Sequence, residues 1–138
     1  MNSKRILIVD DEPGVTRNLK LNLQAMAGYD VRTENDSTRA IDAAREFHPQ
    51  LILLDVLMPR LDGCDISARI HADSELKDTP IVFLTALAHN EDTGGHAVVA
   101  GATVYFAKPV DTEELIRCIE QTLSSGTPPP QGTLFPRL

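Results

Sequence analysis

The stretch Leu51–Gly63, with the sequence LILLDVLMPRLDG, decides how the rest of the chain is interpreted. Its first four residues are large and apolar, and this short apolar run has Pro49 before it and Pro59 after it. We therefore expect a short strand that is buried on both faces of a sheet. Asp55 ends that strand. In open α/β sheets, ligands bind in the crevice outside the carboxyl ends of the strands, so Asp55 lies where a binding site is expected.

Composition and charge limit the class of protein. A chain of 138 residues that is 42% hydrophobic can bury one sizeable core, so we expect one domain. No secretory or membrane-spanning stretch is evident, and we expect a cytoplasmic protein without membrane contact. The formal net charge of −7 argues against direct nucleic-acid binding and favours a protein partner or a cation. Cys64 and Cys118 have neither a metal-ligand spacing nor a disulfide pattern, so both are expected to be reduced thiols.

Apolar runs alternate with helical patterns along the chain, which is typical of a doubly wound α/β fold with a five-stranded parallel sheet. The segment 29–33 alternates apolar and polar residues and is expected at a sheet edge. Gly126 and three consecutive prolines end the pattern, and we expect a flexible, Pro-rich tail at 125–138. The expected strands are 6–9, 29–33, 51–54, 81–84 and 104–107, and the expected helices are 13–27, 37–47, 65–72, 91–100 and 111–123.

Polar residues follow several of these strands where each one ends: Asp10 and Asp11, then Asp55, Thr85 and Lys108. Carboxylate oxygens without His or Cys suit a hard cation such as Mg²⁺, which also accepts a phosphate oxygen. A lysine ammonium and a threonine hydroxyl can neutralise and hydrogen-bond the oxygens of a transferring phosphoryl group. Asp55 is then a candidate nucleophile that forms an aspartyl phosphate.

Four segments closely resemble motifs of the receiver domain of two-component response regulators, of the stand-alone, chemotaxis-regulator-like type. They are Val9–Pro13, Leu54–Gly63, Thr85–Ala86 and Tyr105–Pro109. The resemblance covers about Lys4 to Ser124, so we assign 1–124 to a receiver domain. It implies a flavodoxin-like fold with strand order 2-1-3-4-5. It also implies a single-domain regulator that controls partner binding in phosphorelay signal transduction.

The resemblance implies a role for each residue at the strand ends. Asp55 would accept a phosphoryl group from a histidine kinase or a phosphotransfer protein. Asp11, Asp55 and the backbone carbonyl of Leu57 would bind Mg²⁺ directly, and Asp10 mostly through water. Thr85 and Lys108 would hold the phosphoryl oxygens. The Lys108–Pro109 bond is expected to be cis.

The resemblance also implies a switch. As Thr85 moves toward the phosphoryl group, Tyr105 would enter the space that it leaves. This changes the surface formed by the fourth helix (91–100), the fifth strand (104–107) and the fifth helix (111–123), which docks a downstream protein target. From the residues alone, Tyr105 can equally be an ordinary strand aromatic.

Two other functions fit the same residues. One is a scaffold that uses the fold without phosphorylation. The other is a Mg²⁺-dependent phosphatase with an aspartyl nucleophile, which needs an acid/base carboxylate two residues after the nucleophile, where Leu57 stands. The favoured interpretation is not an enzyme beyond self-catalysed phosphoryl transfer and dephosphorylation. Asp62 is expected to be a turn residue, with Gly63 supplying permissive backbone angles.

Overall fold

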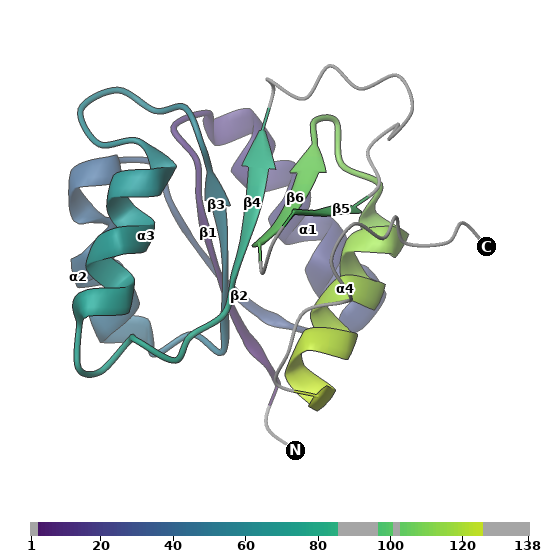
Figure 1. Ribbon diagram of the computed structural model, residues 1–138. Helices are drawn as coiled ribbons and strands as arrows, with labels where there is room; N and C mark the ends of the chain where they lie inside the picture. Colours follow the sequence, from purple (N-terminus) through teal and green to yellow (C-terminus); the bar gives the residue numbers. More distant parts are fainter. Residues whose placement is uncertain (1–2, 86–96, 101–102, 126–138) are drawn as a thin grey trace.

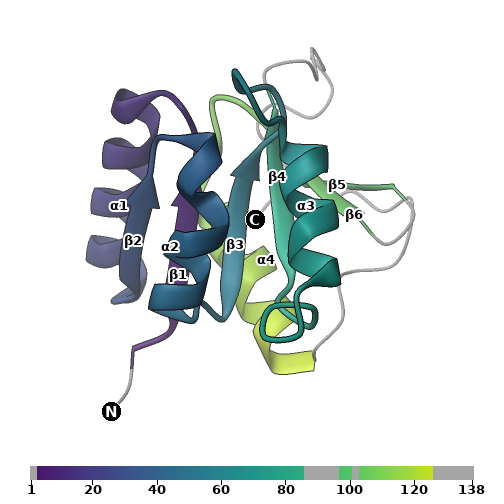
Figure 2. The same ribbon diagram turned by 90° about the vertical axis from the view of Figure 1, so that its left-hand side faces the viewer.

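The computed structural model describes residues 3–85, 97–100 and 103–125, which form a sheet covered by helices on both faces (Figures 1 and 2). Helices α1 (Pro13–Ala27) and α4 (Thr112–Ser125) lie on one face, and α2 (Ala40–Phe47) and α3 (Gly63–Ala72) on the other. The predicted tail beyond residue 125 and residues 91–96 of the predicted fourth helix lie outside the described residues.

The sheet has six strands in the order β2-β1-β3-β4-β6-β5. The neighbours from β2 to β6 pair in parallel. These five strands confirm the predicted parallel sheet and its order, and β2 lies at an edge as its alternating sequence predicted. The strands are β1 (Arg5–Val9), β2 (Asp30–Glu34), β3 (Leu51–Asp55), β4 (Ile81–Thr85), β5 (Ala97–Ala100) and β6 (Thr103–Ala107).

The prediction of a helix over 91–100 is wrong for Ala97–Ala100, which form β5. This strand pairs antiparallel with β6, with Ala100 opposite Thr103 and Ala97 opposite Phe106. Two consecutive β-branched valines, Val98 and Val99, favour a strand once a neighbouring strand is available for pairing. Tertiary pairing with β6 therefore decides the structure of this segment.

The side chains of β3 are buried on both faces of the sheet, as its continuous apolar run predicted. Leu51 and Leu53 belong to the cluster under α1 and α4, and Ile52 and Leu54 to the cluster under α2 and α3. All four are fully buried. Successive side chains of a strand point to opposite faces, so one strand supplies both halves of the core and holds Asp55 rigidly at its end.

Local signals place the helix ends near the expected residues. Pro13 is in the first turn of α1, and Gly28 ends the helix with φ 68°, a left-handed conformation that glycine adopts without strain. Asp36 caps the short 3₁₀ helix η1 (Ser37–Arg39) that precedes α2, and Asp62 caps α3. None of the helices within the described residues is long and apolar enough to cross a membrane.

Candidate functional site

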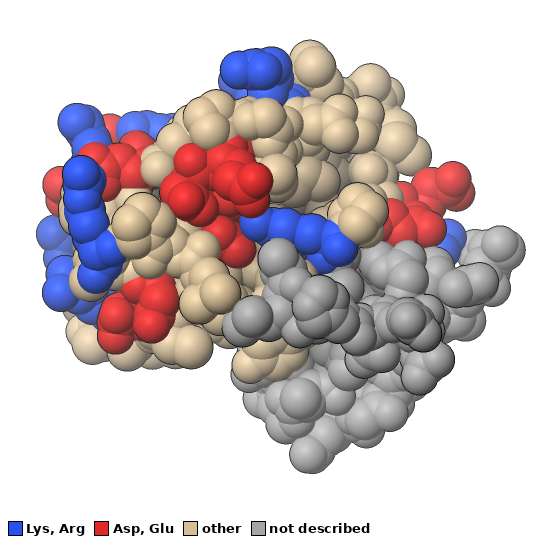
Figure 3. Space-filling view, turned by 90° about the horizontal axis from the view of Figure 1, so that it is seen from above, with Lys and Arg blue, Asp and Glu red and all other residues tan. Residues whose placement is uncertain are grey.

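The register of the parallel strands brings the predicted site residues to one edge of the sheet. Val9 lies opposite Leu54, so Asp10 follows β1 beside Asp55 at the end of β3. Thr85 ends β4, and the backbone N–H of Lys108 donates to the Thr85 carbonyl at 3.0 Å. Seen from this edge, acidic side chains gather near the centre of the face with basic atoms beside them (Figure 3).

Three carboxylates form the centre of the site. Asp10, Asp11 and Asp55 each offer an oxygen, and these oxygens lie within 4.8 Å of one another. Asp10 is fully buried, Asp55 is 3% exposed and Asp11 is partly exposed. Like charges this close repel, and burial removes the water that would solvate them. The cluster therefore favours a bound cation.

Lys108 reaches into this cluster from the end of β6. Its ammonium lies 2.7 Å from Asp10 Oδ2, 3.2 Å from Asp55 Oδ1 and 3.4 Å from Glu12 Oε1. Burial lowers the pKa of Lys108, but its contacts with Asp10 and Asp55 outweigh this and leave the pKa raised. The side chain therefore stays charged and joins two acid-bearing strand ends.

The Asp55 carboxyl is the perturbed acid of the site. Burial and the neighbouring charge of Asp10 raise its pKa to about 6, against the lowering effect of Lys108. The ionised form is thus destabilised until positive charge is added. A carboxylate held in this way is a candidate nucleophile toward an electrophilic phosphorus.

The donor set fits Mg²⁺. All side-chain ligands are carboxylate oxygens, which a hard cation prefers. Asp10 Oδ1 accepts a hydrogen bond from the Glu12 N–H at 3.0 Å. Asp10 Oδ2 is buried and, within the described residues, receives no hydrogen bond of regular geometry, although the Lys108 ammonium lies beside it. Leu57 is two residues beyond Asp55 with an exposed apolar side chain, so its backbone carbonyl is the group that it can offer a cation.

Thr85 and Tyr105 lie on the same face of neighbouring strands. Thr85 is buried, and it comes two residues after Phe83, which is opposite Tyr105 in the β4–β6 pair. The Tyr105 ring is partly buried and stacks on Phe83 with ring centroids 5.4 Å apart. The two predicted switch residues are therefore diagonal neighbours across the sheet.

The loop after β3 packs its backbone against the site. The Gly63 N–H donates to the Val56 carbonyl at 2.8 Å, and a Cβ atom on Gly63 would lie 2.4 Å from the Asp55 carbonyl oxygen. Gly63 is required by this close approach, so the prediction that it supplies unusual backbone angles is wrong. The left-handed residue of the loop is Arg60, with φ 74°. The predicted cis bond before Pro109 is confirmed.

Sequence reasoning missed three polar residues at this edge. The Glu12 side chain points to Lys108, and α1 receives no side-chain cap bond from it. Asn35 donates to the backbone carbonyl of Asp10 at 2.8 Å, and the buried Ser37 donates to the carbonyl of Pro59 at 2.7 Å. For Asn35 and Ser37 the available signal was their position just after the edge strand β2, which ends at the same edge of the sheet. Glu12 instead follows β1, directly after Asp10 and Asp11.

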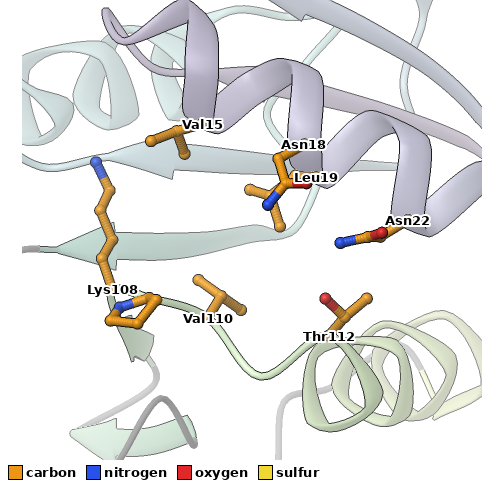
Figure 4. Close-up of a pocket in the computed structure, with 8 residues that line it drawn as sticks. Val15, Asn18, Leu19, Asn22, Lys108, Val110 and Thr112 are labelled. Carbon is orange, nitrogen blue, oxygen red and sulfur yellow. The ribbon is translucent and has the colours of Figure 1, made fainter.

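A groove of about 130 Å³ opens beside Lys108, between α1 and the connection from β6 to α4 (Figure 4). Val15 and Leu19 line it from α1, and Val110 from the connection. Asn18 adds a polar group beside Leu19, and Asn22 and Thr112 add polar groups at the end away from Lys108 (Figure 4). Because Lys108 belongs to both, the groove and the carboxylate cluster are adjoining parts of one surface.

The family model for the response regulator receiver domain matches residues 6–120 of the chain. The DNA-binding dual master transcriptional regulator RpaA of Synechocystis is 36% identical over 119 residues, which cover 86% of this chain and 48% of RpaA. The DNA-binding response regulator MtrA of Mycolicibacterium smegmatis is 35% identical over 120 residues, which cover 87% of this chain and 50% of MtrA. The chain thus spans about half the length of the curated relatives it matches.

Solved structures agree with this match. A putative response regulator from Chloroflexus aurantiacus superimposes with a TM-score of 0.74 at 29% identity, covering 89% of this chain and 99% of its own. The chemotaxis protein CheY4 of Vibrio cholerae gives a TM-score of 0.72 at 28% identity, covering 86% of this chain and 98% of its own. Phosphorylation and Mg²⁺ are general features of the family. The chain belongs to the receiver domains of two-component response regulators.

Proposed function

We propose that this chain is a phosphorylation-driven binding switch that accepts a phosphoryl group on Asp55. The observation that carries the proposal is the cluster of Asp10, Asp11 and Asp55, in which Asp10 and Asp55 contact the ammonium of Lys108. It combines a buried nucleophile with an excess of negative charge that a cation can balance. Receiver domains interact with histidine kinases, so we propose a histidine kinase or a phosphotransfer protein as the phosphoryl donor.

The proposed reaction is an in-line displacement at phosphorus. An oxygen of Asp55 forms a bond to the phosphorus of a phosphohistidine as the N–P bond breaks, and the imidazole leaves with the electron pair. The Lys108 ammonium, 3.2 Å from Asp55 Oδ1, balances charge on the phosphoryl oxygens. Thr85, at the end of the adjacent strand β4, donates a hydrogen bond to one of them.

Mg²⁺ is the cation that we propose for this cluster. Asp11, Asp55 and the carbonyl of Leu57 would hold it, with Asp10 acting mostly through water. When bound, the ion neutralises charge on the carboxylates and on the phosphoryl oxygens. Asp10 also anchors Lys108 at 2.7 Å, so the same acid that serves the cation keeps the lysine in the site.

We propose that the signal passes from Thr85 to Tyr105. A movement of Thr85 toward a phosphoryl group on Asp55 would free space on the face that Tyr105 shares with it. The partly buried ring would then become more buried and alter the surface that includes β6 and α4. Residues 91–96, the other expected part of this surface, lie outside the described residues.

A protein target is the proposed recipient of the signal. RpaA and MtrA are DNA-binding proteins by name, but this chain matches about half of each. Its net charge of −7 opposes binding to a phosphate backbone, so we propose that the chain itself does not contact nucleic acid. CheY4, of which the chain covers 98%, is a chemotaxis protein by name and supports the proposed action as a single-domain regulator. Response regulators are typically cytoplasmic, so we propose that location for this chain.

The two alternative functions have less support. Leu57 is exposed and apolar, so the acid/base carboxylate of an aspartyl phosphatase is absent at the position where it is needed. A scaffold without phosphorylation has no use for three carboxylates gathered around Lys108, which destabilise the fold without a cation. No described contact favours either function.

The test is the intact mass of the protein after incubation with acetyl phosphate. The native chain should gain one phosphoryl group with Mg²⁺ and none with EDTA. Asp55→Asn should gain none under either condition. Asp62→Asn is the matched control, because Asp62 lies in the same loop and caps α3 outside the cluster, so it should react as the native chain does. A folded native chain that gains no mass would favour the scaffold.

The switch can be followed through tyrosine emission, because the chain has no tryptophan and two tyrosines, Tyr29 and Tyr105. In a Tyr29→Phe background, Tyr105 is the remaining fluorophore. Phosphorylation should reduce its quenching by acrylamide as the ring becomes buried, and adding Thr85→Ala should abolish that change. Unchanged quenching on fully phosphorylated protein would contradict the proposed path.

A further inference from the structure

A turn of three residues, Asn35–Ser37, touches both loops that bear the candidate cation ligands. It links β2 to η1 at the carboxyl edge of the sheet. The loop from Asp10 to Glu12 lies on one side of it, and the loop from Val56 to Asp62 lies on the other. We call it the 35–37 turn. Nothing in the phosphoryl chemistry proposed above uses it.

The first residue of the turn holds the loop after β1. Asn35 Nδ2 donates to the Asp10 carbonyl at 2.8 Å and to Thr16 Oγ1 at 3.0 Å. One amide group thus uses both of its N–H donors, which fixes its orientation. The Asp10 N–H donates to the Glu34 carbonyl at 3.1 Å. The backbone of Asp10 is therefore held on both sides by two consecutive residues, and Asp11 follows directly.

The last residue of the turn holds the loop after β3. Ser37 is 5% exposed, and its hydroxyl donates to the Pro59 carbonyl at 2.7 Å and accepts from the Leu61 N–H at 3.3 Å. These two contacts lie on either side of Arg60, the residue with a left-handed backbone. The Leu61 N–H also donates to the Pro59 carbonyl at 2.9 Å, so the buried Ser37 hydroxyl braces a strained bend in the loop that carries the Leu57 carbonyl.

The turn is itself stiff. The Asp36 carboxylate accepts from the Thr38 N–H at 3.0 Å and from the Thr38 hydroxyl at 2.6 Å. The Asp36 N–H donates to Glu34 Oε2 at 3.1 Å. The two bonds from Thr38 lower the pKa of Asp36, with the Thr38 hydroxyl as the main cause. A turn fixed from within can hold two other loops at a constant separation.

We infer that the 35–37 turn is a positioning element that sets the spacing between the two ligand-bearing loops, and that Asn35 and Ser37 act through it on cation affinity. The inference rests on the proposed function, because it assumes a Mg²⁺ site between these loops. Mg²⁺ demands near-octahedral geometry, and hydrogen bonds behind the ligands keep them in place. Loosening either loop weakens binding without removing a ligand.

The test compares Asn35→Ala and Ser37→Ala with Thr38→Ala. The control removes one hydrogen bond from the same turn but leaves both loop contacts intact. Mg²⁺ affinity is measured by calorimetric titration, at a temperature where circular dichroism shows each variant folded. We expect the dissociation constant to rise about tenfold for Asn35→Ala and for Ser37→Ala, and to stay within twofold for Thr38→Ala. Ser37→Thr retains the hydroxyl and should restore native affinity.

The rate of phosphorylation distinguishes a variant whose ligand-bearing loops are displaced from a variant whose whole structure is disturbed. The Mg²⁺ concentration that gives half the maximal rate with acetyl phosphate should rise by the same factor of about ten in both variants. The rate at saturating Mg²⁺ should change by less than twofold, because Asp55 and Lys108 are untouched. A purely structural defect would lower the saturating rate instead.

The possible results are distinct. The role of the turn is overturned if Asn35→Ala and Ser37→Ala bind Mg²⁺ as tightly as Thr38→Ala does. It is also overturned if they bind Mg²⁺ with native affinity but react more slowly at saturating Mg²⁺. Either result leaves the proposed function standing. A native chain that binds no Mg²⁺ overturns the proposed function first and the inference with it. If Ser37→Ala fails to fold, Asn35→Ala alone decides, because Asn35 is exposed and its side chain can be removed without opening the core.

Discussion

The two edges of the sheet treat acidic side chains in opposite ways. At the carboxyl edge, one cation serves several acids, because the Lys108 ammonium lies beside Asp10, Asp55 and Glu12. At the other edge, Asp73 and Glu120 each have a cation of their own: Asp73 accepts from Arg45 Nε at 2.8 Å and from its terminal nitrogen at 2.5 Å, and Glu120 lies 3.4 Å from Lys4. The two edges therefore differ in how many carboxylates surround one cation: several at the carboxyl edge, and one in each of these pairs at the opposite edge.

The pKa directions express this difference. The hydrogen bonds from Arg45 lower the pKa of Asp73, whereas burial and Asp10 raise the pKa of Asp55 to about 6. A group with a lowered acid pKa stabilises the folded state when ionised, and a group with a raised one opposes it. The carboxyl edge is therefore arranged to receive further positive charge, whereas the charge of Asp73 at the opposite edge is already balanced by Arg45.

The largest effect is expected from removing the shared cation. Lys108→Met leaves Asp10 and Asp55 buried beside each other, and we expect it to lower the free energy of unfolding by about 3 kcal/mol in EDTA. Lys4→Met removes an exposed cation from the opposite edge and should change it by about 0.5 kcal/mol or less. Urea denaturation of both variants measures the contrast. Equal losses would show that the edges do not differ.

Removing one of the crowded acids should have the opposite sign. Asp55→Asn keeps the shape of the side chain but removes a buried charge that Asp10 and Asp11 repel. We expect it to stabilise the protein by about 1–2 kcal/mol in EDTA, at the loss of phosphorylation. Saturating Mg²⁺ should raise the melting temperature of the native chain and leave that of the variant nearly unchanged. A destabilised variant would mean that Lys108 already balances the cluster.

Much of this contrast could be predicted from the sequence, because each strand is a local apolar run and a parallel sheet brings all carboxyl ends to one edge. That reasoning alone places Asp55, Thr85 and Lys108 close together. It failed at Ala97–Ala100, where pairing with β6 overrides local helical signals. It also missed the Asn35 contact with Asp10, since a hydrogen bond between residues 25 positions apart leaves no periodic pattern in the sequence.

Left-handed backbone at a non-glycine residue occurs at both edges, at His48 (φ 52°) at the end of α2 and at Arg60 in the loop of the carboxyl edge. Arg60 has φ 74°, where a side chain with a Cβ atom is disfavoured by about 1–2 kcal/mol. Arg60→Gly relieves this strain. Two effects oppose the gain, because the variant loses the weak ion pair with Asp36 and glycine increases the conformational entropy of the unfolded chain. We therefore expect a net stabilisation of about 0.5 kcal/mol. Thermal denaturation measures it. A clear loss of stability would show that the Arg60 side chain holds the loop more firmly than its single ion pair suggests.

The smallest effect is expected at the opposite edge, and it depends on pH. Asp73 accepts from Arg45 and from the Glu75 N–H, which lower its pKa, so its contribution is present above about pH 4 and is lost as pH falls through the lowered pKa of the folded state. Asp73→Asn should therefore be less stable than the native chain at pH 7, and the difference should shrink toward pH 3. Urea denaturation across that range measures it. A difference that is independent of pH would mean that Asp73 acts through its hydrogen bonds and not through its charge, and the two edges would then differ in geometry alone.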